Sequence, residues 1–285
     1  IQSMMVSYKG TAGSDVVAGW STNDIINGLD GNDVLGGGMG NDILQGGAGN
    51  DVLTDAAGVN LFDGGAGADT LTGNAAAEFF IGGTGNDTIT TGNGADIIAF
   101  NRGDGMDVVN GGIGTDNTLS LGKGIAYTDL ALSKVNNDLI IEVGAGEQIT
   151  LANWYNTTAN YQSVLDLQVM ADAIAGFNAT STDPLLNQAV QNFNFSNIVA
   201  SFDQARGTSA TFQHWSMTNS LLAARLSGSD TLALGGDLAH QYGTMGTLTG
   251  MNLAAAQTAL NTPNFGSQAQ TLHLLQGLQG GGMVL

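Results

Sequence analysis

The sequence predicts a mainly β chain with three parts: a parallel β-roll solenoid over residues 1–118, a β-rich capping segment over 119–160 and an α-rich tail over 161–285. Three observations lead to the solenoid. An acidic residue recurs every nine positions, glycines cluster just before it, and an apolar residue follows it two positions later. A strict nine-residue period of this kind is typical of a roll in which each repeat supplies one tight turn and one short strand.

The acidic positions keep their spacing without a slip over ten repeats. Eight of them are aspartates, one is an amide and one is a glutamate: Asp15, Asp24, Asp33, Asp42, Asp51, Asn60, Asp69, Glu78, Asp87 and Asp96. The phase breaks after the last of these, where Asp107 follows at eleven residues and Asp116 nine residues later. We therefore expect the closing coils over 100–118.

Each repeat divides into a turning half and a strand half. The best copies, such as residues 37–45, 46–54 and 82–90, read Gly-Gly-x-Gly-x-Asp-x-U-x, in which U is apolar. The glycines permit positive φ angles in the turn, and the U side chain points inward from the strand. All ten inward positions are apolar: Val17, Ile26, Leu35, Leu44, Leu53, Phe62, Leu71, Phe80, Ile89 and Ile98.

This pattern resembles the RTX (haemolysin-type calcium-binding) repeat family. The resemblance implies a right-handed coil of two repeats, with Ca²⁺ held between the loops of successive coils on one edge. Each Asp would then pair with the Asp 18 residues further on, and backbone carbonyls of the glycine loops would complete the oxygen shell that this hard cation requires. The predicted calcium ligands are Asp15, Asp24, Asp33, Asp42, Asp51, Asp69, Asp87, Asp96, Asp107, Asp116, Gly38, Gly40, Gly47, Gly49, Gly65, Gly67, Gly83 and Gly85.

Sorting the acidic positions by 18 separates two edges of unequal quality. The first edge carries only aspartates, at 15, 33, 51, 69 and 87, whereas the second contains both exceptions, Asn60 and Glu78. We expect four good calcium sites on the first edge and a plausible one between Asp24 and Asp42. The three gaps that involve Asn60 or Glu78 should be weak or empty, because alanine stands at glycine positions in their loops and Asn lacks the charge.

The capping segment predicts strands over 130–135, 139–143 and 148–151, with a turn at Asn136-Asn137-Asp138. Its expected role is to cover the open end of the last coil.

Helix signals dominate the tail. A capping-box pattern at 163–166 predicts a helix that ends near Gly176, and Asp183-Pro184 predicts the start of a second helix. Further helices are expected over 217–227 and 252–261. The uncharged end, 274–285, resembles the C-terminal regions of large bacterial RTX proteins exported by type I secretion, which implies the type I secretion machinery as a partner during export.

Composition excludes several classes of function. The formal net charge of −19 disfavours nucleic acid and anionic membranes and favours divalent cations. The chain has no Cys, so it has no disulfides or thiolate metal sites. No apolar run reaches the length of a membrane-spanning helix, and no signal peptide is apparent. Neither a catalytic residue set nor a Gly-x-Ser-x-Gly motif is found, so we expect no enzyme activity.

These observations lead to two hypotheses about function. In the first, the chain is a secreted extracellular structural module that folds on meeting calcium and forms a homo-oligomer or polymer, such as a surface layer, filament or matrix. In the second, it is the calcium-binding and secretion region of a larger RTX toxin, hydrolase or adhesin.

Overall fold

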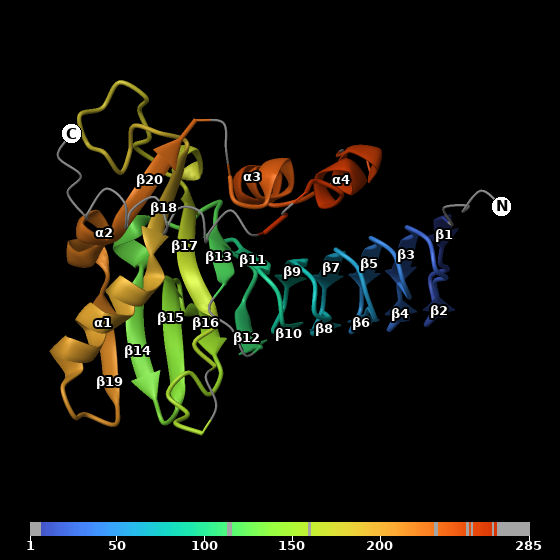
Figure 1. Ribbon diagram of the computed structural model, residues 1–285, viewed down its shortest axis with the longest axis horizontal. Helices are drawn as coiled ribbons and strands as arrows, with labels where there is room; N and C mark the ends of the chain where they lie inside the picture. Colours follow the sequence, from blue (N-terminus) through green and yellow to red (C-terminus); the bar gives the residue numbers. More distant parts are fainter. Residues whose placement is uncertain are drawn as a thin grey trace.

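The computed structural model describes residues 7–112, 116–158, 161–230, 233–248, 251, 253–263 and 265–266. They form two ten-stranded sheets and several helices (Figure 1). The repeats build a solenoid of about six turns that carries one strand of each turn in each sheet, as predicted.

The first sheet, called sheet A, contains the odd-numbered strands of the roll. Within the roll all of its pairs are parallel, and partner residues are 18 apart from Ser7↔Ile25 to Phe79↔Ile97. Its roll strands are β1 (Ser7–Lys9), β3 (Ile25–Asp30), β5 (Ile43–Ala48), β7 (Leu61–Ala66), β9 (Phe79–Thr84), β11 (Ile97–Phe100) and β13 (Asn117–Leu121).

The second sheet, sheet B, contains the even-numbered strands with the same 18-residue offset as far as β10. The offset widens to 20 at the next strand, where Thr88 pairs with Val108, because the extra residues after Asp96 lengthen that turn. Its roll strands are β2 (Val16–Ala18), β4 (Val34–Gly36), β6 (Val52–Thr54), β8 (Thr70–Thr72), β10 (Thr88–Gly92) and β12 (Met106–Gly111).

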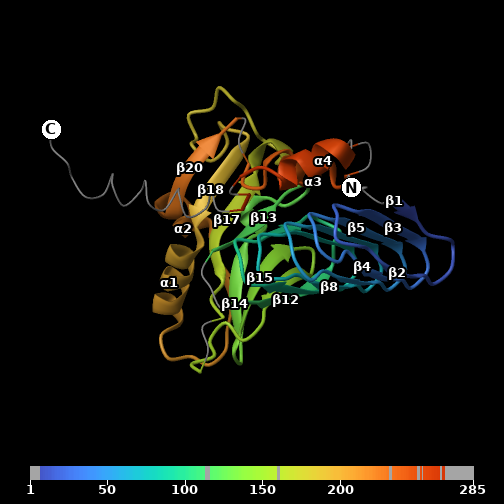
Figure 2. The same ribbon diagram turned by 45° about the vertical axis from the view of Figure 1, so that its right-hand side comes forward.

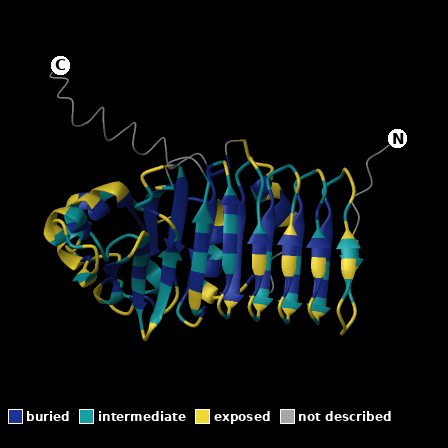
Figure 3. Ribbon diagram, turned by 90° about the horizontal axis from the view of Figure 1, so that it is seen from below, coloured by how far each residue is buried: buried dark blue, intermediate teal, exposed yellow. Residues whose placement is uncertain are grey.

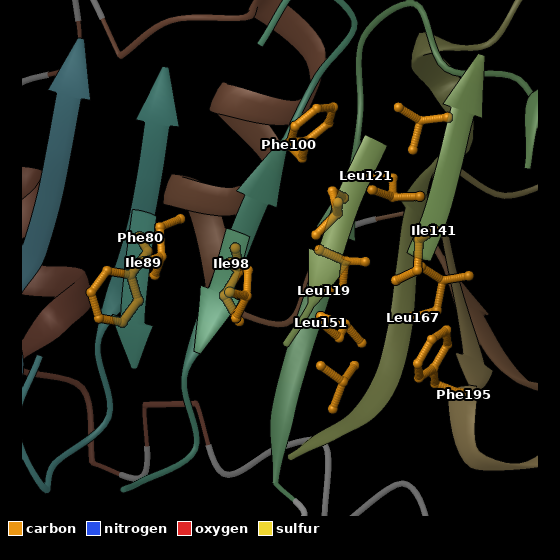
Figure 4. Close-up of a cluster of buried hydrophobic side chains, with 14 of the residues drawn as sticks. Phe80, Ile89, Ile98, Phe100, Leu119, Leu121, Ile141, Leu151, Leu167 and Phe195 are labelled. Carbon is orange, nitrogen blue, oxygen red and sulfur yellow. The ribbon is translucent and has the colours of Figure 1, made fainter. Parts of the chain in front are cut away.

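The space between the sheets holds the predicted inner core. Nine of the ten predicted side chains are at most 2% exposed, and Val17, in the second strand, is partly buried. Phe62 and Phe80 stack with ring centroids 5.0 Å apart. This ladder of apolar side chains continues without interruption into the cap, through Phe100, Leu119 and Leu167 (Figure 4).

The chain beyond the last coil extends both sheets, and the capping segment supplies three of the strands added to sheet B. The three predicted strands are confirmed as β14 (Ala131–Val135), β15 (Asp138–Gly144) and β16 (Glu147–Leu151). Strand β16 pairs in parallel with β12, so it covers the edge that the roll would otherwise leave open. In sheet A the corresponding strand is β17 (Val164–Met170), which pairs in parallel with β13.

The tail mixes strands and helices, and two predicted helices are wrong. Residues 163–176 contain strand β17 and a 3₁₀ turn, Ala171–Ala173, and the stretch after Asp183-Pro184 leads into strand β18 (Val190–Asn194). Both strands belong to sheet A, in which β17 pairs with β13 and β18, and β18 also pairs with β20 (Arg225–Ser229). The backbone hydrogen bonds of these pairs outweigh the local helix propensity. Strand β19 (Phe212–Ser216) adds to sheet B.

The helices of the tail begin later than the first two predictions placed them. Helix α1 (Phe195–Arg206) was not predicted, whereas α2 (Thr218–Ala224) and α4 (Leu253–Leu260) confirm the other two expectations in part of their ranges. The Asn194 side chain caps α1 by accepting a hydrogen bond from the Asn197 amide. The predicted export region, 274–285, lies outside the described residues.

Helices α3 (Gly236–Met245) and α4 lie on the outer face of sheet A (Figures 1 and 2). They bury the residues that directly follow the acidic positions of one edge, namely Ile25, Ile43, Leu61, Phe79 and Ile97. Tyr242 anchors α3, since its hydroxyl donates to Asp104 Oδ2 at 2.9 Å. The roll therefore has a second apolar core outside its own coil.

The outer face of sheet B has no such cover among the described residues. The equivalent positions Val16, Val34 and Val52 are 84%, 45% and 37% exposed. Figure 3 views this side and shows exposed segments on the strands nearest the N-terminus. The two faces differ because large apolar residues occupy the sheet A positions, whereas valine and threonine occupy those of sheet B.

Candidate calcium sites along the two loop edges

The acidic side chains of the first edge form a continuous column. The backbone amide of each aspartate donates to Oδ1 of the aspartate in the next coil, from Asp15 to Asp33 at 2.7 Å and onward through Asp51, Asp69 and Asp87 at 2.7 to 2.8 Å. Asp107 continues the column, because its Oδ1 accepts from the Asp87 amide at 3.0 Å. The predicted pairing of positions 18 apart is therefore confirmed.

These hydrogen bonds use only one oxygen of each carboxylate. The second oxygen, Oδ2, is buried and has no hydrogen-bond partner in Asp33, Asp42, Asp51, Asp69, Asp87 and Asp96. A buried carboxylate oxygen without a donor is costly unless a cation or a proton neutralises it. Two parallel columns of such oxygens are a specific reason to expect bound cations.

The loop glycines bring backbone carbonyls close to these carboxylates. A Cβ at Gly46 would lie 2.3 Å from Asp51 Oδ2 and 2.5 Å from the carbonyl oxygen of Gly64, one coil further on. Gly47 and Gly49 have φ of 113° and 133°, and a Cβ on either would lie within 1.8 Å of a carbonyl oxygen in the preceding coil. A side chain does not fit at either position, so glycine there lets the backbones of successive coils approach closely.

Burial raises the pKa of several acids in the columns. Desolvation is the main cause at Asp42, Asp69, Asp87 and Asp107, and neighbouring carboxylates add to it at Asp42, Asp69 and Asp107. The pKa rises to about 7 for Asp69, about 6 for Asp87 and about 8 for Asp42 and Asp107. At neutral pH the folded roll therefore needs either protons or cations along its edges.

Acidic pH should partly replace calcium as the folding trigger. Because the folded-state pKa values lie above the ordinary value of 3.8, protons favour the calcium-free folded roll at low pH, and this stabilisation is lost as pH rises through about 6 to 8. In a chelator, we expect more β structure by circular dichroism at pH 5 than at pH 8. Equal spectra at the two pH values would contradict this expectation.

The second edge is less regular at the positions that the sequence singled out. Asp24 and Asp42 join the column, with amides donating to Oδ1 of Asp42 and of Asn60 at 2.6 and 2.7 Å. Among the described residues, no such bond joins the Asn60 amide to Glu78. The longer Glu78 side chain instead turns back, and its Oε2 accepts from the Asn74 amide at 3.3 Å.

The column resumes above Glu78, whose amide donates to Asp96 Oδ1 at 2.9 Å. The Asp96 amide then donates to Asn117 Oδ1, also at 2.9 Å, so Asn117 rather than Asp116 occupies the next step. The sequence pattern did not single out Asn117, because the insertion after Asp96 displaces it from the nine-residue phase. The assignment of Asp116 as a ligand stays a prediction.

The two edges should respond unequally to matched substitutions. Both Asp51→Ala and Asn60→Ala leave a buried amide without its acceptor, but only Asp51→Ala removes a carboxylate. We expect Asp51→Ala to raise the calcium concentration at the folding midpoint several-fold more than Asn60→Ala. Equal shifts in a calcium titration followed by circular dichroism would show that the edges do not differ.

The oxygen arrangement fits calcium better than a softer metal. Among the described residues, no group of three or more His, Cys, Asp and Glu side chains is placed to hold an ion. An ion on an edge would therefore take one or two carboxylates from each pair of coils and its remaining ligands from backbone carbonyls. Carbonyl and carboxylate oxygen suits Ca²⁺, which tolerates irregular shells of six to eight ligands. Bound there, calcium would neutralise the columns and tie successive coils together.

A family model and one solved structure are similar to parts of this chain. The model of the RTX calcium-binding nonapeptide repeat matches residues 8–35, 36–71 and 72–106. Among solved structures, the extracellular lipase LipA from Serratia marcescens is similar over 57% of this chain and 40% of the lipase chain, with 19% identity and a TM-score of 0.32. No curated protein matches.

The family match covers the same coils that carry the two carboxylate columns, from Tyr8 to Met106. The RTX calcium-binding nonapeptide repeat is therefore found in residues 8–106 of this chain.

Proposed function

We propose that this chain is the calcium-triggered folding module of a secreted bacterial protein and that its task is structural rather than catalytic. The buried, donor-free Oδ2 atoms of both columns carry this proposal, because they make the folded roll dependent on a cation. RTX repeats are typical of secreted bacterial proteins. No helix in the described part of the chain is long and apolar enough to cross a membrane.

Calcium would organise more than the roll itself. Helix α4 contacts a second-edge loop directly, because Gln257 Nε2 donates to the Asn41 carbonyl at 2.8 Å and Asn41 Nδ2 donates to Asn261 Oδ1 at 2.7 Å. The outer core also requires sheet A to be formed before α3 and α4 can bury their apolar faces. Ordering of the loops is thus linked to docking of the tail.

This arrangement suits export in an unfolded state. Extracellular calcium modules bind with dissociation constants of about 10⁻⁴ to 10⁻³ M, so they remain empty in a calcium-poor cytosol and fill outside the cell. The high negative charge, −19, would keep the calcium-free chain extended and soluble. Type I secretion is the route that we propose, since it exports unfolded RTX proteins.

We also propose that folded copies associate with one another. At the start of the roll, β1 and β2 are terminal strands, each with a single neighbour among the described residues. Val16 lies in β2 and Trp20 in the turn that follows it, and they are 84% and 71% exposed. Large apolar side chains that no described element covers favour contact with another copy.

Electron microscopy and light scattering of the purified full chain test association. With millimolar calcium we expect ordered oligomers or polymers, and with a chelator we expect an expanded monomer. Trp20→Ser should weaken association without altering calcium-induced folding, because its side chain is solvent-exposed. Monodisperse folded monomers at high protein and calcium concentration would refute self-assembly and leave the folding role intact.

A further inference from the structure

The repeat at residues 55–60 departs from the pattern at its first, second and sixth positions, and the first and sixth departures compensate each other. Asp55 stands where the repeat has its first glycine, and Asn60 stands where it has its aspartate. The copy therefore keeps one carboxylate but carries it five residues earlier. Neither position is explained by the general motif.

The carboxylate of Asp55 points into the second-edge column. Its Oδ1 accepts a hydrogen bond from the Ala57 amide at 2.8 Å, which fixes its direction, whereas Oδ2 is buried and has no partner. Asp42, which is 0% exposed, directs its own unpartnered Oδ2 to the same place. The two oxygens lie 2.0 and 2.6 Å from the point where a Cβ on Gly37 would sit.

Ordinary copies explain why the exchange works. In them, the Cβ position of the first glycine lies next to the aspartate of the same copy, at 2.3 Å for Gly46 and Asp51 Oδ2 and 2.5 Å for Gly64 and Asp69 Oδ2. A side chain at the first position therefore enters the space beside its own sixth position, and two carboxylates there would repel each other.

Asn60 keeps the hydrogen-bonding role that the aspartate has in the other copies. Its Oδ1 accepts from the Asp42 amide at 2.7 Å, and its Nδ2 donates to the Gly58 carbonyl at 3.0 Å. The hydrogen bond of the column is thus kept by position 60, while the negative charge is supplied by position 55.

We propose that Asp55 replaces the lost carboxylate and, together with Asp42, forms a calcium site between loops 37–42 and 55–60. This inference rests on the calcium-binding role of the repeats. It replaces, for this one gap, the sequence-based expectation of a weak or empty site. The break between Asn60 and Glu78 is unaffected. Of the three gaps on the second edge that were expected to be weak or empty, two would remain.

Four variants of the full chain test the site through the number of calcium ions bound, measured by equilibrium dialysis with metal analysis at pH 7.5. Asp55→Gly should lower the count by about one ion per chain, because a buried pair of carboxylates loses one member. Asp55→Gly combined with Asn60→Asp restores the first and sixth residues of the repeat pattern at unchanged net charge and should restore the ion. Asp30→Ala, which removes the exposed carboxylate at the end of β3, is the matched control and should keep the count of the parent.

The outcomes separate the possible failures. An unchanged count in Asp55→Gly would overturn the proposal and would indicate that Asp42 and Asp55 share a proton instead of an ion. Equal losses of bound calcium in Asp55→Gly and Asp30→Ala would show that only the net charge matters, and this result would also overturn the proposal. If Asp55→Gly fails to fold, Asp55→Asn, which keeps the side-chain volume, should show the same loss in the same assay. Absence of calcium from the parent chain itself would refute the proposed function rather than this site alone.

Discussion

Removal of calcium is expected to unfold the roll over residues 7–112 and to release the tail helices from it. Stacked coils lie about 4.8 Å apart, and like charges at that spacing repel by roughly 1 kcal/mol per pair in water and by more where burial lowers the dielectric. Each coil buries few apolar side chains of its own, so the inner ladder cannot offset repulsion along two columns.

The same treatment should affect distant elements. The outer face of sheet A is the surface that α3 and α4 cover, and it exists only while the coils are stacked. In a chelator at pH 8 we expect loss of most β signal in circular dichroism, together with rapid hydrogen exchange in both the roll strands and α3. Millimolar calcium should restore both, whereas magnesium at the same concentration should not, because it demands a smaller octahedral shell.

A chelated sample that keeps its native spectrum and thermal midpoint would contradict this expectation. Loss of protection in the roll alone, with α3 unchanged, would preserve calcium-dependent folding but would show that the tail helix folds independently of sheet A. The two readouts therefore test separate parts of the expectation.

Substitution of Gly49 by alanine is expected to produce the second large effect. Its φ is 133°, and an added Cβ would lie 1.7 Å from the carbonyl oxygen of Gly31 in the preceding coil. Left-handed backbone alone costs an L-residue about 1 to 2 kcal/mol, and the clash forces two calcium loops apart. We expect a loss of at least about 2 kcal/mol in calcium-saturated stability, measured as a lower urea midpoint.

Gly13→Ala is the matched control within the same kind of loop. Gly13 is exposed, its φ lies outside the left-handed region, and the nearest atom to an added Cβ is Thr11 Oγ1 at 3.9 Å. Its free energy of unfolding, obtained from the urea midpoint, should stay within about 0.5 kcal/mol of that of the parent. Similar losses in both variants would mean that glycine acts in these loops through chain entropy and not through close contact between coils.

Much of the candidate site could be predicted from the repeat. Asp51 lies next to Asp33 and Asp69 because each coil has 18 residues and stacks on the next at that fixed offset. The regular period did not reveal Asn117 or Asp55, since the first lies beyond an insertion and the second occupies a glycine position. A scan for carboxylates displaced within a degraded copy would have found Asp55.

The tail shows where local patterns fail. The capping-box pattern at Ser163–Asp166 predicts a helix, but Asp166 lies in β17 opposite Thr118 and Asn194. The open edge of β13 offers a full ladder of backbone hydrogen bonds and burial of Leu167 in the inner core, and these long-range contacts exceed the small propensity differences between helix and strand.

By itself, then, the sequence determined the roll: its strands, its inward side chains and its two columns of acids, because all of these depend on contacts between identical neighbours at a fixed offset. Only the tertiary structure decided how the chain ends. Placement of α3 and α4 on sheet A, of β17 beside β13 and of β18 beside β17, depends on which distant surface buries the most apolar area, and no local pattern encodes that choice.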